Sequence, residues 1–186
     1  MNNSAILWRG FFLPGHEACR VFSENERWYL DGAANFSHDQ QPCRLDYLVA
    51  CDGDWVTRSA RVAGRVGEKP IKIDLSVDKN QQRWILNGVE QPAVEGCVDV
   101  DLNFSPSTNL LPIRRLNLAV GESSEVNAAW LRFPDFELHP LRQVYRRLDD
   151  NTYRYESHDG KFTAELKVNS IGLVTSYPGV WEQEKS

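Results

Sequence analysis

The feature that most constrains the fold of this chain is a repeated alternation of apolar and polar side chains between short turn sequences. Residues 71–78 and 162–168 alternate without a break, and residues 45–51 do so more loosely. Such alternation is typical of β-strands with one buried face. Glycine dipeptides that favour tight hairpin turns occur at Asp31-Gly32, Asp52-Gly53, Asn87-Gly88 and Asp159-Gly160. The pattern therefore predicts consecutive antiparallel hairpins.

The number of predicted strands indicates a curved sheet. Ten or more strands cannot lie in one flat sheet, because strand twist accumulates and large sheets curl or split. We therefore expect a mainly β fold, with an extensive antiparallel sheet curved into a barrel or half-barrel and few short helices. The best helical segment is 111–116, where Pro112 limits the helix to a turn or two. No linker composition divides the chain, which predicts a single domain over residues 1–186.

Charge and hydropathy restrict the partners and the location. The net charge of −5 disfavours nucleic acid and anionic membrane surfaces. No apolar stretch approaches the roughly 20 residues that span a bilayer, so no integral membrane segment is predicted. The first ten residues lack the basic start and apolar run of a secretory signal. These features predict a cytoplasmic protein.

The cysteines and histidines give no sign of a metal or redox site. The four cysteines form no C-x-x-C pair, and no two histidines stand three to five residues apart. Structural zinc sites and redox motifs depend on such spacings. We therefore predict neither a metal site nor a cofactor.

One strand, residues 98–104, carries the residues most suggestive of a site. Its apolar residues at even positions share one face, and its polar residues at odd positions share the other. Asp99 and Asp101 would then project from the same face, about 7 Å apart. The turn-forming segment 105–109 leads from this strand to Arg114 and Arg115, two cations that could pair with the carboxylates.

Three interpretations of these charges are open. The polar face could simply be solvated, with weak exposed ion pairs. Asp99 and Asp101 could serve a hydrolase acting on a glycosylated or phosphorylated substrate, although nearby arginines would keep both ionised and a general acid needs one raised pKa. If the concave surface instead binds another protein or is merely filled by side chains, the same four charges would form a buried ionic network whose role is fold specificity.

The strand and its sequel also carry a family resemblance. Residues 97–102, followed by the run Ser105-Pro106-Ser107-Thr108-Asn109-Leu110-Leu111-Pro112-Ile113-Arg114-Arg115-Leu116, resemble the signature of a bacterial family named as putative glycolipid-binding proteins. Matching pieces follow the same order through the chain, from Leu30-Asp31-Gly32 to Tyr177-Pro178-Gly179-Val180-Trp181. The resemblance implies an antiparallel sheet wrapped like a lipid carrier, and lipid binding by analogy of fold.

We therefore expect a protein that holds an amphiphilic small molecule, such as a glycolipid, on the concave face of the sheet and catalyses no reaction. Aromatic side chains offer apolar area and polar tips, which suits sugar rings and acyl chains. The predicted ligand-binding residues fall into three groups: aromatic lining from Trp55, Tyr177 and Trp181; donors to phosphate or carboxylate oxygens from Arg58, Arg114 and Arg115; and contacts to sugar hydroxyls from Asp99, Asp101 and Asn109.

Overall fold

The structure is a computed structural model that describes residues 4–78 and 83–185. Residues 1–3, 79–82 and 186 lie outside the described residues, and so do both ends of the predicted domain 1–186. The described strands form one sheet of fifteen in the order β8-β7-β6-β5-β4-β3-β2-β1-β15-β14-β13-β12-β11-β10-β9. The two halves of the chain therefore meet where β1 pairs with β15.

We call β1–β8 the first arm and β9–β15 the second arm. The first arm comprises β1 (Ser4–Gly10), β2 (Gly15–Glu24), β3 (Arg27–His38), β4 (Gln41–Cys51), β5 (Thr57–Val66), β6 (Lys69–Val77), β7 (Trp84–Leu86) and β8 (Val89–Glu90). The second arm comprises β9 (Asp99–Leu102), β10 (Ser123–Arg132), β11 (Glu137–Arg147), β12 (Thr152–Ser157), β13 (Phe162–Val168), β14 (Val174–Tyr177) and β15 (Trp181–Gln183). The helical segments are η1 (Pro92–Val94), η2 (Ser107–Asn109) and α1 (Leu110–Leu116).

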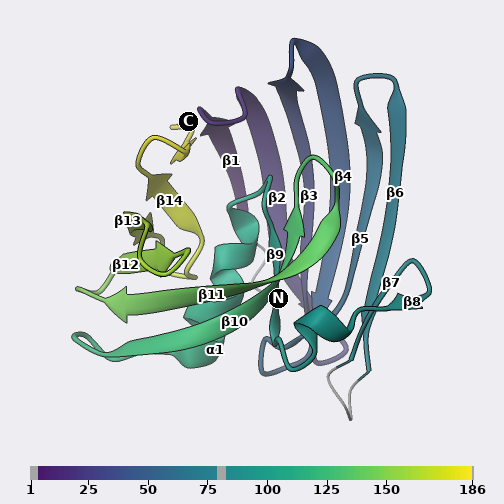
Figure 1. Ribbon diagram of the computed structural model, residues 1–186. Coiled ribbons are helices and arrows are strands. Elements are labelled where there is room, and N and C mark those ends of the chain that lie inside the picture. The colour runs from purple at the N-terminus through teal and green to yellow at the C-terminus, as the bar shows by residue number, and fades with distance from the viewer. Residues whose placement is uncertain (1–3, 79–82, 186) are drawn as a thin grey trace.

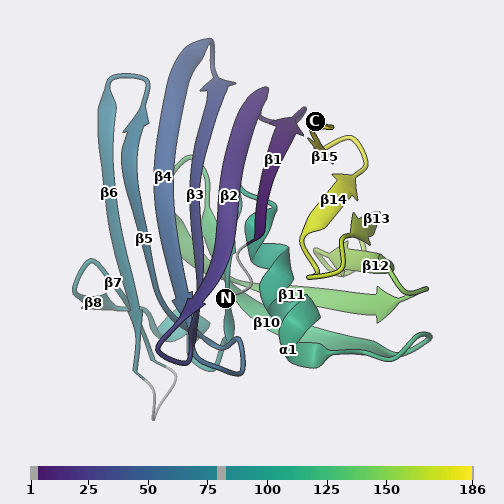
Figure 2. The ribbon, with the colours of Figure 1, turned by 180° about the vertical axis from the view of Figure 1, so that it is seen from behind.

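The sheet bends so that the second arm crosses in front of the first, with α1 between them (Figures 1 and 2). The predicted mainly β fold with a curved sheet and few short helices is confirmed. Of the two predicted shapes, the closed barrel is wrong, because the sheet is open and ends at β8 and β9. Pairing is antiparallel except between β9 and β10, which run parallel. None of the described helices is long and apolar enough to cross a membrane.

Three of the four predicted turns join strands, and one does not. Asp52-Gly53, Asn87-Gly88 and Asp159-Gly160 lie in connections between strands. Asp31-Gly32 lies inside β3 instead. Gly32 stands opposite Tyr47 of β4, where an added Cβ would come within 2.4 Å of the tyrosine ring. The glycine is therefore required by close packing rather than by a turn.

Side chains of the protein itself fill most of the concave face. The main core packs the inner face of the first arm against β9, the first turn of α1 and parts of β10 and β11. Its fully buried members include Leu30, Leu75, Leu102 and Leu110. A smaller core covers part of the second arm and includes Ile113 of α1. The four cysteines are buried and free.

A buried carboxyl group ties the β9–η2 connection to the first arm. Glu17 of β2 is fully buried, and its Oε1 accepts hydrogen bonds from the hydroxyls of Tyr47 (2.6 Å) and Ser105 (2.5 Å). Its Oε2 is buried without a partner. Burial raises the pKa of Glu17 to about 8, although the two hydrogen bonds oppose the shift. Glu17 is therefore mostly protonated at neutral pH.

This carboxyl group makes the stability pH-dependent. The folded protein keeps the Glu17 proton up to about pH 8, whereas the unfolded chain loses it near pH 4.5. Stability therefore falls as pH rises through this window, by up to about 1.4 kcal/mol per pH unit. We expect Glu17→Gln to flatten the dependence between pH 6 and 8 in urea denaturation, while the exposed Glu24→Gln control keeps the wild-type slope. An unchanged slope in Glu17→Gln would contradict this assignment.

Candidate functional site

Strand β9 separates the main core from a cavity. Val100, Leu102 and, just beyond the strand, Phe104 pack into the main core, as the alternation predicts. On the opposite face, Asp101 and Asn103 line the cavity. Asp99 is 1% exposed, so the interpretation of this face as a solvated surface is wrong. Both faces of β9 are therefore interior.

Two threonine hydroxyls satisfy the free edge of β9. Thr57 at the start of β5 accepts a hydrogen bond from the backbone N–H of Val100 (3.0 Å), and Thr108 of η2 accepts one from Leu102 (3.2 Å). The N–H of Thr57 in turn donates to the carbonyl of Val98. Because buried backbone groups need partners, these contacts let an edge strand lie inside the protein.

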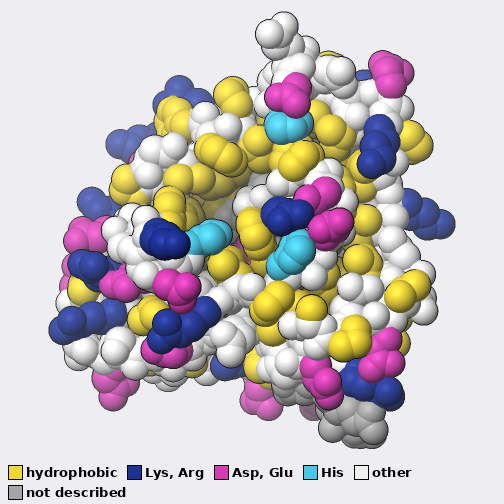
Figure 3. Space-filling model, viewed as in Figure 1, with side chains coloured by type: hydrophobic (Ala, Val, Ile, Leu, Met, Phe, Trp, Pro, Cys, Tyr) yellow, Lys and Arg dark blue, Asp and Glu magenta, His cyan; other side chains and the backbone are white. Residues whose placement is uncertain are grey.

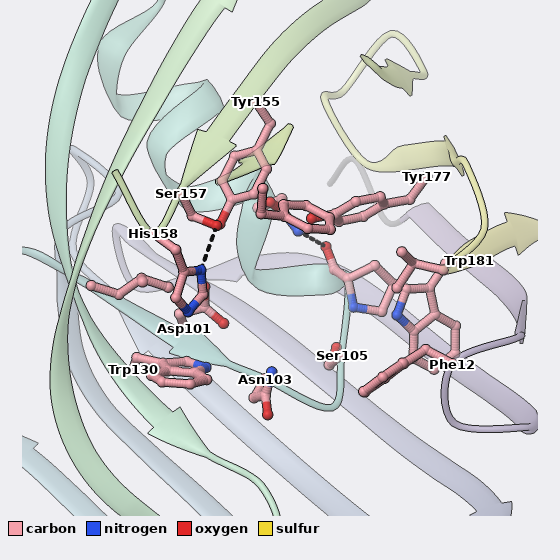
Figure 4. A pocket seen from close by; sticks show the side chains of 15 residues that line it. Phe12, Asp101, Asn103, Ser105, Trp130, Tyr155, Ser157, His158, Tyr177 and Trp181 are labelled. Carbon is pink, nitrogen blue, oxygen red and sulfur yellow. Dashed lines mark hydrogen bonds between the residues drawn. The ribbon is translucent and has the colours of Figure 1, made fainter. Parts of the chain in front are cut away.

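The cavity occupies about 300 Å³ and opens to the surface. Figure 3 shows a hollow with hydrophobic side chains around much of its rim, and Figure 4 shows the lining side chains. The lining residues come mainly from the second arm, the β9–η2 connection and the β1–β2 connection: Phe12, Asp101, Asn103, Ser105, Pro106, Asn109, Trp130, Leu141, Tyr155, Ser157, His158, Phe162, Tyr177, Val180 and Trp181.

Aromatic rings form much of the wall. Tyr155, Phe162 and Tyr177 contact one another, with each pair of ring centroids 6.1 Å apart. Trp130, on the strand next to Asp101, meets the ring of His158 edge-on at 5.7 Å. In Figure 4 the rings of Trp130, Tyr155 and Tyr177 stand around a common space. Asp101 and His158 lie on one side of it, and Phe12 and Trp181 lie on the other.

Gly10 makes room for Trp181. The two residues are paired across β1 and β15, and an added Cβ on Gly10 would lie 2.8 Å from the indole ring. Trp181 is buried apart from its contact with the cavity. The meeting point of the two arms thus supplies one wall of the site.

Polar groups in the wall are held by neighbours. The backbone N–H of Phe133 donates to Asn103 Oδ1 (3.1 Å), which leaves the Nδ2 donor of this amide for a ligand. Gln143 Nε2 donates to Asp101 Oδ2 (2.6 Å). Ser157 Oγ and His158 Nδ1 are 3.0 Å apart. Donors and acceptors therefore line the same cavity as the rings.

The charge of Asp101 is poorly compensated. Burial raises its pKa to about 6, and the hydrogen bond from Gln143 opposes the shift only in part. Burial raises the pKa of Tyr155, and the Asp101 carboxylate raises it further. Burial also raises the pKa of Asp99, although its pair with Arg115 opposes the shift. Of the two aspartates that we expected nearby arginines to hold ionised, Asp99 is paired with Arg115, whereas the side-chain partner of Asp101 is Gln143.

Four of the predicted ligand-binding residues line the cavity: Asp101, Asn109, Tyr177 and Trp181. Both polar atoms of the Asn109 side chain already form hydrogen bonds. Its Oδ1 accepts one from the hydroxyl of Tyr145 (2.9 Å), and its Nδ2 donates one to the carbonyl of Pro106 (3.2 Å). It therefore holds the wall in place rather than offering a free amide.

The other five predicted residues are not among those that line the cavity. Asp99 accepts both contacts of a bidentate pair with Arg115, at 3.1 and 2.5 Å. Arg58 pairs with Asp52 at 2.5 Å. The two remaining residues, Arg114 and Trp55, contact each other: the guanidinium of Arg114 lies 5.5 Å from the Trp55 ring centroid. Trp28 stacks on the same Trp55 ring, with the ring centroids 4.4 Å apart.

Sequence reasoning missed Phe12, Trp130, Tyr155, Ser157, His158 and Phe162. One signal was present. Inward positions of β11 and β12 are apolar or aromatic except Gln143 and Ser157, which face each other across the two strands. A polar pair on a buried face is a marker of a site, because buried polar groups need partners. Among the described residues, no group of three or more His, Cys, Asp or Glu is arranged to hold a metal ion.

The fold and the cavity define an open, curved β-sheet protein with a small cavity that opens to the surface. Comparison with protein-family models matches residues 5–183 to the family described as "Putative glycolipid-binding", and the chain belongs to this family. The predicted resemblance is thus confirmed. A crystal structure of a DUF1089 family protein from Pseudomonas aeruginosa is similar, with 34% sequence identity and a TM-score of 0.77 over 90% of this chain and 92% of that chain. Comparison with curated proteins found no match.

The buried ion pair between Arg115 and Asp99 allows a test of whether Arg115 has a structural or a ligand-binding role. We expect Arg115→Ala to lower the free energy of unfolding by about 3–5 kcal/mol, because it leaves the buried Asp99 carboxylate without a partner. Denaturant unfolding measures the change. The control Arg142→Ala breaks an exposed pair with Glu125 and should change stability little. An unchanged stability of Arg115→Ala with weakened ligand binding would instead make Arg115 a ligand contact.

Proposed function

We propose that the protein binds the head group of a glycolipid, with one sugar ring or a group of similar size in the cavity. The observation that carries this proposal is the combination of aromatic rings with hydrogen-bonding groups around one small space. Sugar rings present apolar faces to aromatic side chains and hydroxyls to polar ones. The volume of about 300 Å³ stands at the lower end of ligand pockets, which suits a head group better than a whole lipid.

The acyl tail would leave through the mouth of the cavity. The concave face of the first arm is filled by the main core, which disfavours the predicted path of the tail along that face. Phe12 of the β1–β2 connection and Phe162 of β13 line the cavity and are 71% and 37% exposed. Exposed apolar side chains beside a binding site suit contact with an apolar part of the ligand.

The lining supports binding more than hydrolysis. Most glycoside hydrolases use two carboxylates, placed on the two sides of the scissile bond. Of Asp99 and Asp101, only Asp101 lines the cavity, and Asp99 is bound by Arg115. The raised pKa of Asp101 would suit a general acid, but the lining residues include no second carboxylate to act with it.

The direct test is extraction of gently purified protein with organic solvent, followed by mass spectrometry against a matched control protein from the same host. We expect a stoichiometric glycolipid in the extract. Background lipid alone, together with no shift of the melting temperature by a panel of added glycolipids, would overturn the proposal. Incubation of the same glycolipids with the protein tests hydrolysis, for which we expect no released sugar.

A pair of tryptophan variants tests where the ligand binds. Trp130→Leu removes an aromatic face from the cavity, whereas Trp28→Leu removes a tryptophan that stacks on Trp55 outside it. Loss of one ring contact corresponds to about 1.4 kcal/mol, or roughly tenfold in affinity. Calorimetric titration with an extracted or added glycolipid should show this loss for Trp130→Leu and wild-type affinity for Trp28→Leu. Equal effects of the two variants would place the ligand elsewhere.

A further inference from the structure

The cavity contains an uncompensated negative charge. Among the fifteen residues that line it, Asp101 is the one carboxylate, and none is lysine or arginine. His158 is exposed at the turn after β12, and its Nδ1 is engaged with Ser157. Proteins pair buried charges with opposite charges, since an unpaired one is costly to desolvate.

The carboxylate also has a free oxygen. Gln143 donates to Asp101 Oδ2, and no described residue, within 4–78 and 83–185, donates to Oδ1. The arginine on the same side of β9, Arg115, makes both its contacts with Asp99. Asp101 is half-buried because part of it faces the cavity. An acceptor oxygen is thus left to whatever enters.

The aromatic rings around Asp101 also favour a cationic ligand. Tyr155, Phe162 and Tyr177 form a mutually contacting group, and Trp130 stands on the strand beside Asp101. The faces of such rings carry negative potential and attract a cation that lies close to them. The carboxylate and the aromatic faces around this cavity therefore both favour a positively charged ligand.

From this arrangement we infer that the bound head group carries a positive charge, an ammonium group that pairs with Asp101 among the aromatic rings. The inference rests on the proposed function and narrows its ligands to glycolipids with an amino sugar. It runs against the predicted anionic head group, because Arg58, Arg114 and Arg115 do not line the cavity. A quaternary ammonium head group shares the same chemistry without a sugar.

Four soluble probes separate these ligands: methyl glucosaminide, methyl glucoside, methyl glucuronide and choline. Their binding is measured by calorimetric titration of the intact protein at pH 7.5. This pH lies above the Asp101 pKa of about 6, so Asp101 is mostly ionised. We expect the glucosaminide to bind at least tenfold more tightly than the glucoside, and the glucuronide to bind most weakly. Ion pairing in a partly desolvated site accounts for the direction of this series.

Variants assign the preference to one carboxylate. Asp101→Asn should bind the glucosaminide and the glucoside equally. The control is Asp46→Asn, which changes the net charge equally at a half-buried aspartate of β4 that does not line the cavity, and it should keep the preference. If Asp101→Asn does not fold, the order of the probes on the wild-type protein still decides the inference.

The outcomes separate the two proposals. Equal binding of glucosaminide and glucoside, or tighter binding of the glucuronide, would overturn the charge inference and leave sugar binding standing. Binding of choline without any glycoside would support the cationic site and overturn the proposed glycolipid. No binding of any probe would overturn both.

Discussion

The interior position of β9 depends on the hydroxyls of Thr57 and Thr108. An edge strand exposes unpaired N–H groups, and burying them without partners would cost more than the packing of one short strand returns. The two threonines supply those partners from β5 and η2. Once the edge is satisfied, one face of β9 completes the main core, and the other places Asp101 and Asn103 in the wall of the cavity.

The same constraint explains why buried polar residues gather around this strand. Asp99, Ser105, Ser107 and Thr108 are all buried within the strand and its sequel, and Asp99 is matched by Arg115. Ser105 connects the segment to Glu17 of β2. Each contact fixes the backbone that carries the site, because a buried polar group without a partner is destabilising. Asp101 differs in having an oxygen that faces the cavity.

Much of the fold, but only part of the site, follows from the sequence. The alternation in residues 98–104 predicts the two faces of β9, since side-chain direction in a strand depends on local geometry. It does not reveal that Arg58 pairs with Asp52 or that Arg114 lies over Trp55. The first contact depends on how the β4–β5 connection folds back over six residues, and the second on where α1 packs. Trp130 and Tyr155 look like core aromatics in the sequence, and only the shape of the second arm exposes them to a cavity.

The segment that leads from β9 to α1 bounds one side of that cavity, through Ser105, Pro106 and Asn109. Strands β14 and β15 have four and three residues, so the second arm offers fewer inward side chains there than the long strands of the first arm. Ile113 of α1 and Leu118 pack into the smaller core on this arm. Asn109, just before the helix, marks the edge of the remaining space. The proposed ligand would therefore meet walls built by the strands on one side and by the β9–η2 segment on the other. This space limits the bound part to a small group, and its apolar part would extend outward.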